Sequence, residues 1–155
     1  MRKLFKATRL LVLLGAALTL AACQTMGGAV LVQSTASAEL TPDAATTIAG
    51  DMVGRLAERV GPGTTTIQLN PDGSSFGQAL EATLREWGYA VATDQVTEGM
   101  DVVKLAYVVD DFEGGILVRL STHALDLTRI YRHGTDGVTP ISPLSVMDRG
   151  AGAAT

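Results

Sequence analysis

The sequence predicts an α+β domain in which two N-terminal amphipathic helices pack on one face of a small, mostly antiparallel sheet. Apolar residues recur at three- and four-residue steps in segments 41–60 and 75–87, which is typical of amphipathic helices. Runs rich in β-branched residues then alternate with turn residues from 89 to 147. Helices placed before such a meander of strands favour the α+β class.

The first helix is expected to begin at Thr41. Thr41, Pro42 and Asp43 combine an N-cap, a proline suited to the first helical position and an acid in the first turn. Gly61 is suited to the left-handed conformation that ends many helices. The predicted apolar stripe consists of Ala45, Ile48, Ala49, Met52, Val53, Leu56 and Val60.

A strand, a turn and the second helix are predicted next. Segment 64–69 is rich in β-branched residues, and segment 70–73 has turn composition. Ser75 and Gln78 have the spacing of a capping box, which predicts a helix start. Trp87 ends the apolar stripe of this helix, so we expect it in the core; an interface anchor is the alternative.

The rest of the chain is predicted as strands, at 89–93, 102–109, 116–122 and 124–131. The segment 139–147 contains two prolines, so it is at best an edge strand or an extended arm. The unit of strand, helix and strand from 64 to 93 would be parallel if its two strands are neighbours.

The first 23 residues have the plan of a secretory signal peptide. Four basic residues and no acid precede an apolar run from Leu10 to Leu20, and small residues follow. Leu20-Ala21-Ala22-Cys23 resembles the lipobox of bacterial lipoproteins, in which the cysteine receives a diacylglycerol and becomes the new N-terminus. The resemblance implies lipidation at Cys23 and a mature chain that keeps 133 of the 155 residues.

A membrane-spanning helix is the competing interpretation of this segment. The eleven apolar residues would reach about 16 Å as a helix, whereas a bilayer core is about 30 Å thick. Gln24 also bears on the destination, because lipoproteins with aspartate directly after the cysteine tend to stay in the inner membrane. The resemblance therefore favours the periplasmic face of the outer membrane, in the cell envelope.

We expect four segments along the chain. They are a signal peptide (1–22), a lipidated N-terminus with a flexible tether (23–40), a single periplasmic domain (41–148) and a frayed tail (149–155).

Charge and cysteine content exclude several classes of function. Of the twelve Lys and Arg, four precede Cys23, which leaves eight against sixteen Asp and Glu. A mature chain about eight charges negative argues against direct nucleic-acid binding, which depends on basic clusters. Cys23 is the sole cysteine, so neither a disulfide nor a cysteine metal cage is expected, and the covalent lipid would be the only attached group.

No pattern of residues predicts catalysis. His123 and His133 lack neighbouring groups at zinc-ligand spacing. Asp110, Asp111 and Glu113 could ligate calcium, but they lack the spacing of a known loop, and a solvated turn is the better interpretation. Neither a nucleophile with its base nor a phosphate loop is evident. We therefore expect a protein that is not an enzyme, with no catalytic or metal-binding residues.

Five residues form a candidate partner surface. Arginine and tyrosine dominate protein interfaces, and the β region holds an unusual number of them for a domain so poor in basic side chains. Internal pairing of these arginines with the abundant acids is an equally open alternative. The candidates are Tyr107, Arg119, Arg129, Tyr131 and Arg132.

Together these features resemble the TrbH family of conjugal transfer lipoproteins. The resemblance rests on the lipobox, the short tether, SFGQALEATLREWGYAV at 75–91, LTRIYR at 127–132 and ISPLSV at 141–146. It implies a structural component of the type IV secretion apparatus that forms mating pairs and passes plasmid DNA between cells. Other subunits of that apparatus would be its partners, and Cys23 is the one site residue that the resemblance carries over. An envelope lipoprotein that regulates a periplasmic enzyme, or helps build an outer-membrane pore, is the alternative.

Overall fold

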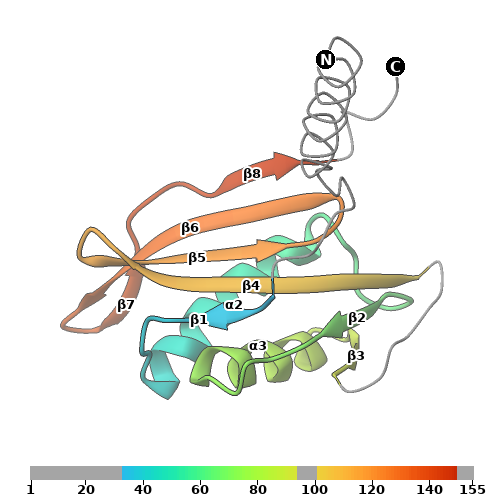
Figure 1. Ribbon diagram of the computed structural model, residues 1–155, viewed down its shortest axis with the longest axis horizontal. Coiled ribbons are helices and arrows are strands. Elements are labelled where there is room, and N and C mark those ends of the chain that lie inside the picture. Colours follow the sequence, from blue (N-terminus) through green and yellow to red (C-terminus); the bar gives the residue numbers. More distant parts are fainter. Residues whose placement is uncertain (1–32, 94–100, 150–155) are drawn as a thin grey trace, which may run out of the picture.

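The computed structural model describes residues 33–93 and 101–149, and the predicted signal peptide and Cys23 lie outside these residues. The described residues form two helices and eight strands, and both helices precede the run of strands from β3 to β8 (Figure 1). Their bounds are β1 Thr35–Ala36, α2 Pro42–Ala57, β2 Thr66–Leu69, α3 Ser75–Glu86, β3 Ala90–Ala92, β4 Val102–Phe112, β5 Gly115–Ser121, β6 Leu125–Gly134, β7 Gly137–Pro140 and β8 Ser145–Asp148.

The predicted architecture of two N-terminal helices on a small, mostly antiparallel sheet is wrong. A strand precedes the first helix, and the second helix connects β2 to β3. The described strands form one eight-stranded mixed sheet, in which β4 pairs in parallel with both β1 and β2, and β2 pairs in parallel with β3. The reason is the length of the connections. A helix or another long segment separates each pair of parallel strands along the chain, and only such long connections allow two strands to lie parallel in one sheet.

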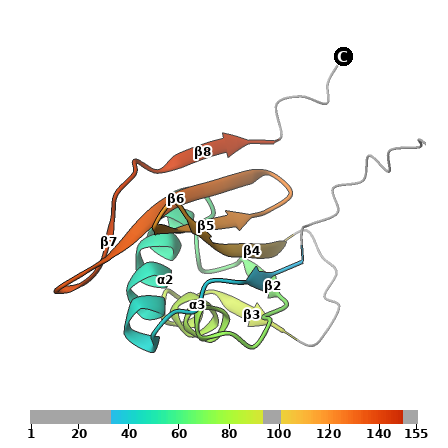
Figure 2. The ribbon, with the colours of Figure 1, turned by 60° about the vertical axis from the view of Figure 1, so that its left-hand side comes forward.

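Two long strands organise the sheet. One edge of β4 pairs with β2 at residues 102–105 and with β1 at 108–109, while its other edge pairs with β5. In the same way, one edge of β6 pairs with β5, and its other edge pairs with β8 and then with β7. The sheet curls so that both helices lie on its inner side (Figures 1 and 2).

The two helices begin and end close to their predicted positions. The hydroxyl of Thr41 accepts a hydrogen bond from the backbone N–H of Ala44 at 3.3 Å. The N-cap of α3 is Ser74 rather than the predicted Ser75, and its hydroxyl accepts from the N–H of Gly77 at 3.0 Å. Because each cap satisfies a backbone donor that the helix leaves unpaired, the caps fix where the helices start.

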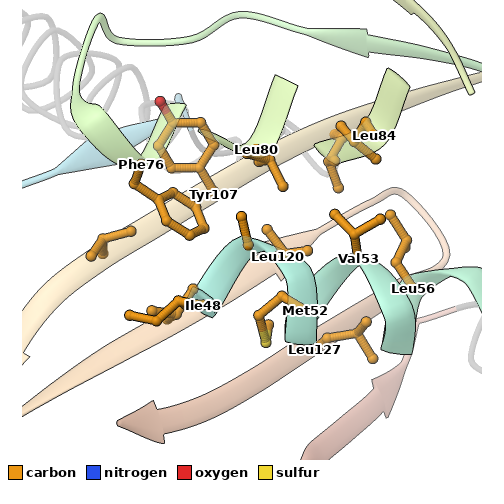
Figure 3. Close-up of a cluster of buried hydrophobic side chains, with 14 of the residues drawn as sticks. Ile48, Met52, Val53, Leu56, Phe76, Leu80, Leu84, Tyr107, Leu120 and Leu127 are labelled. Carbon is orange, nitrogen blue, oxygen red and sulfur yellow. The ribbon is translucent and has the colours of Figure 1, made fainter. Parts of the chain in front are cut away.

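The core lies between the helices and the inner face of the sheet (Figure 3). Ile48, Met52 and Leu56 of α2 and Leu80 and Leu84 of α3 are fully buried there with Leu120 and Leu127 of the strands. Trp87, predicted in the core, is 46% exposed. It follows the last residue of α3, where the helical stripe ends, and its ring covers Gly54 of α2 from the outside.

A buried tyrosine connects the sheet to the start of α3. Tyr107 of β4 is fully buried, packs edge-on against Phe76 with ring centroids 5.2 Å apart, and donates a hydrogen bond to Asp72 at 2.6 Å. Its hydroxyl in turn accepts from the N–H of Asp72 at 3.0 Å. Gly77 faces this hydroxyl so closely that a Cβ at position 77 would overlap it.

The segment 33–40 belongs to the folded domain, although it was predicted as part of the tether. Its N–H groups at Ser37 and Ala38 donate to the carbonyl of Val109 at 2.9 and 3.2 Å, and the N–H of Ala36 donates to Asp72 at 2.7 Å. The hydroxyl of Ser37 is also hydrogen-bonded to Asp110. The remainder of the predicted tether, 23–32, lies outside the described residues.

The close approach at Gly77 predicts that Gly77→Ala destabilises the protein by about 1–3 kcal/mol, because the added methyl must displace Tyr107 or the start of α3. Gly50→Ala is the matched control. Position 50 lies inside α2 with open space around it, so alanine should stabilise the helix by up to about 1 kcal/mol. Urea unfolding of a soluble form that begins at Gln24 measures both changes, and an unchanged midpoint for Gly77→Ala would contradict the packing described.

The hydrogen bonds to the carboxylate of Asp72 predict that the stability of the protein depends on pH. The partial burial of this carboxylate raises its pKa, but hydrogen bonds from Ser74, Tyr107 and Ala36 outweigh this effect, so the pKa of Asp72 lies below its ordinary value. Its contribution to stability is therefore fully present above the ordinary aspartate pKa and is lost as the pH falls through the lowered one. Asp72→Asn should reduce the loss of stability between about pH 6 and about pH 3, measured by urea unfolding. Asp136→Asn, in the exposed turn before β7, serves as the control and should leave the wild-type slope.

Candidate partner-binding surface

Three of the five candidate residues point to the inner face of the sheet. The register pairs Tyr107 with Leu120, Arg129 with Val118 and Tyr131 with Ile116, and residues directly opposite each other share a face. Tyr107 and Tyr131 are fully buried, and the side chain of Arg129 is only 16% exposed. These three residues therefore cannot form an open docking surface.

Arg129 and Tyr131 bind an aspartate of helix α2. One carboxylate oxygen of Asp51 accepts hydrogen bonds from Nη1 of Arg129 at 2.7 Å and from the hydroxyl of Tyr131 at 2.6 Å. Arg129 Nε also donates to the carbonyl of Ser142 at 3.2 Å, in the connection between β7 and β8. Burial, and then the bond to the Asp51 carboxylate, hold the pKa of Tyr131 well above its ordinary value, so the phenol stays protonated and remains a donor.

Arg129 is thus paired with an acid inside the domain, which is the alternative of internal pairing. Tyr107 behaves in the same way: burial, with a contribution from the neighbouring Asp72, raises its pKa to about 12. In each case the partner of the β residue lies far away in the chain, on α2 or at the start of α3. The sequence shows the acids and the arginines but does not show which of them meet.

Arg119 and Arg132 lie on the opposite, outer face of the sheet, and both are exposed. No ion pair within 33–93 and 101–149 includes either residue. They lie among side chains of β4, β5 and β6 that face the same way, several of them half-buried and apolar. We define the outer patch as Val108, Leu117, Arg119, Thr128, Ile130 and Arg132.

The apolar members of the outer patch were not among the candidates from the sequence. Leu117 and Ile130 are opposite each other on β5 and β6, and Phe112, at the end of β4, is 42% exposed near the same hairpin. The available signal was the alternation of residues along segment 116–122, which places Leu117 and Arg119 on one face. Which face is open depends on where the helices pack.

The other polar candidates are spread over the fold. His123 is exposed in the turn between β5 and β6, and His133 is exposed near the end of β6. His133 and Arg132 line a shallow hollow of about 290 Å³ with Glu39 and Asp111. Asp110 is held by Ser37, and no group of three His, Cys, Asp or Glu in the described part of the chain is arranged to hold a metal ion.

The tail begins with a fixed residue. Arg149 binds Asp126 of β6 through two hydrogen bonds of 2.7 and 2.8 Å, so it is attached to the sheet rather than frayed. Neither helix in the described residues is long and apolar enough to cross a membrane.

Comparison with known proteins identifies similar sequences. The family model described as "Conjugal transfer protein TrbH" matches residues 25–150. A protein of Sinorhizobium fredii (strain NBRC 101917 / NGR234), described as "Probable conjugal transfer protein TrbH", is 44% identical over 135 residues, which cover 84% of this chain and 90% of that protein. No solved structure matches the chain.

The contact between Asp51 and Arg129 predicts that Asp51→Ala and Arg129→Ala each destabilise the protein by about 2 kcal/mol, because each removes one member of a partly buried ion pair. The double variant should cost less than the sum of the two, since the residues are in direct contact. Arg132→Ala is the control for a lost arginine and should change stability by less than about 0.5 kcal/mol. Urea unfolding of all four variants measures these values; strictly additive effects would show that the pair is not coupled.

Proposed function

Because the chain belongs to the TrbH family of conjugal transfer proteins, we propose that it is an outer-membrane lipoprotein that helps assemble the plasmid transfer apparatus. The family match over 25–150 is the observation that carries this proposal, since it spans the whole described domain. A role in conjugal transfer follows from family membership. The lipid anchor, the outer membrane and the structural role are what we add.

The lipid anchor is proposed at Cys23, on the basis of Leu20-Ala21-Ala22-Cys23 behind a short apolar run. The docked segment at 33–40 supports a short connection between lipid and domain. Only ten residue steps separate Cys23 from Gln33, which span at most about 35 Å. The domain would thus stay close to the membrane, and any partner in the same membrane would meet it at a high effective concentration.

The structural role is proposed as one of placement rather than catalysis. Of the histidines and acids considered from the sequence, His133 and Asp111 line one shallow hollow, whereas His123 lies in a separate turn of the described domain. A catalytic site needs more converging groups than this. The outer patch instead offers exposed arginines beside half-buried apolar side chains, which is the composition of an interface. Other subunits of the transfer apparatus are the proposed partners.

The anchor predicts a specific effect of two substitutions. Wild-type protein in conjugating cells should incorporate a clickable fatty acid and fractionate with the outer membrane, whereas Cys23→Ser should incorporate none and should lower the transfer frequency at least about tenfold through loss of local concentration. Gln24→Asp should stay lipidated but move to the inner membrane. Equal labelling of wild type and Cys23→Ser would contradict the proposed lipidation.

A further inference from the structure

The outer patch has a defined geometry, which the strand register fixes. Arg119 of β5 lies between Val108 of β4 and Thr128 of β6. Two residues further along β6, Ile130 lies opposite Leu117 of β5. Arg132 is two residues beyond Ile130 on the same face.

The two arginines therefore lie at the ends of a short diagonal. Four residues along β6 separate Thr128, the neighbour of Arg119, from Arg132, which is about 14 Å in an extended strand. Leu117 and Ile130 occupy the space between, and both are half-buried. The patch is thus a strip with a positive charge at each end and apolar side chains in the middle.

The charge of this strip is opposite to that of the chain. From Cys23 onward the sequence has sixteen acids and eight basic residues, yet two arginines that form no ion pair within the described domain lie on this one face. Of the acids nearby, Asp126 is paired with Arg149, and Asp110, opposite Leu117, is hydrogen-bonded to Ser37. Glu39 and Asp111 line a hollow with Arg132 but form no ion pair with it within the described residues. A partner with complementary charge would be acidic at two points that flank an apolar contact.

The backbone of the patch restricts the form of the partner. At the patch, β5 pairs with β4 on one side and with β6 on the other, so its backbone groups are already hydrogen-bonded and only side chains are offered. A partner lying across it must satisfy its own backbone, which a helix does. Two to three helical turns span about 11–16 Å, which brackets the separation of the two arginines.

We propose that the outer patch binds an acidic amphipathic helix of another conjugal transfer protein. Arg119 and Arg132 pair with two carboxylates of that helix, and Leu117 and Ile130 contact the apolar residues between them. The helix would cover the outer face as α2 and α3 cover the inner one, completing a three-layer arrangement. This proposal rests on the proposed function, because it names the kind of partner for the same docking surface.

A charge reversal tests the proposal in the full-length protein. Arg119→Glu with Arg132→Glu should lower plasmid transfer at least about tenfold, since reversing two interface arginines replaces attraction with repulsion. Arg59→Glu with Arg85→Glu changes the net charge by the same amount at two exposed positions, one in the turn after α2 and one near the end of α3, and should leave transfer unchanged. Suppressors of the first variant should replace Asp or Glu by Lys or Arg in a helix of another transfer protein. Wild-type transfer by the first variant would overturn the proposal, and so would suppressors confined to this chain.

A photo-crosslinking residue at position 117 identifies what covers the patch in conjugating cells. The expected adduct joins this chain to a transfer protein at an acidic helix, is absent with Arg119→Glu and Arg132→Glu, and is absent when the crosslinker is placed at exposed position 47 of α2. An adduct with lipid alone, or with a second copy of this chain, would overturn the proposal.

A deletion strain separates the two proposals. If transfer is normal without the whole chain, the proposed function fails. If the deletion abolishes transfer while the charge-reversed protein, confirmed as folded and lipidated, restores it, only the acidic-helix proposal fails.

Discussion

The pairing of β4 on both of its edges is the constraint on which the rest of the structure depends. Eleven residues long, β4 accepts β1 and β2 side by side along one edge and the whole of β5 along the other. It thereby joins the parallel half of the sheet, with its crossover helix, to the antiparallel meander. The same strand carries Tyr107 into the core, where its hydroxyl meets Asp72 and so positions the start of α3. Loss of this register by one residue would turn Tyr107 to the outer face and remove that connection.

The contact of Asp51 with Arg129 and Tyr131 fixes the position of α2 on the sheet, as the contact of Tyr107 with Asp72 fixes the start of α3. A helix packed on a sheet by apolar side chains alone can slide, because hydrophobic burial is not directional. A carboxylate that accepts from a guanidinium and a phenol at under 3 Å has a defined position and orientation. The same arginine also fixes the connection between β7 and β8, because its Nε donates a hydrogen bond to the carbonyl of Ser142. These polar groups therefore determine how the helix, β6 and the C-terminal strands lie relative to one another.

Most arginines of the described domain form ion pairs with its own acids, and the outer face carries two that do not. Arg129 and Arg149 are bound by acids of the chain itself, and the helix arginines Arg55 and Arg85 have acidic neighbours along their own helices. Arg119 and Arg132, which like Arg59 form no ion pair within the described residues, lie on a face whose strands are already paired. Segment 33–40 runs beside the outer patch, because Thr35 of β1 pairs with Val108 of β4.

The sequence by itself determined the local structure. Thr41 with Pro42 fixed the start of α2, the apolar stripes fixed the extents of both helices, and the β-branched runs located most strands, because caps and periodicity act over a few residues. The lipobox, the tether and the segments 75–91, 127–132 and 141–146 together also indicated the family. Only the tertiary structure decided the mixed eight-stranded sheet, the docking of 33–40, the exposure of Trp87 and the separation of five candidate residues into three on the inner face and two exposed on the outer face. These features depend on contacts between residues that lie far apart, such as Asp51 with Arg129 and Asp72 with Tyr107. Alternation along a strand divides its residues between two faces, but which face is buried is settled only when the helices pack against one of them.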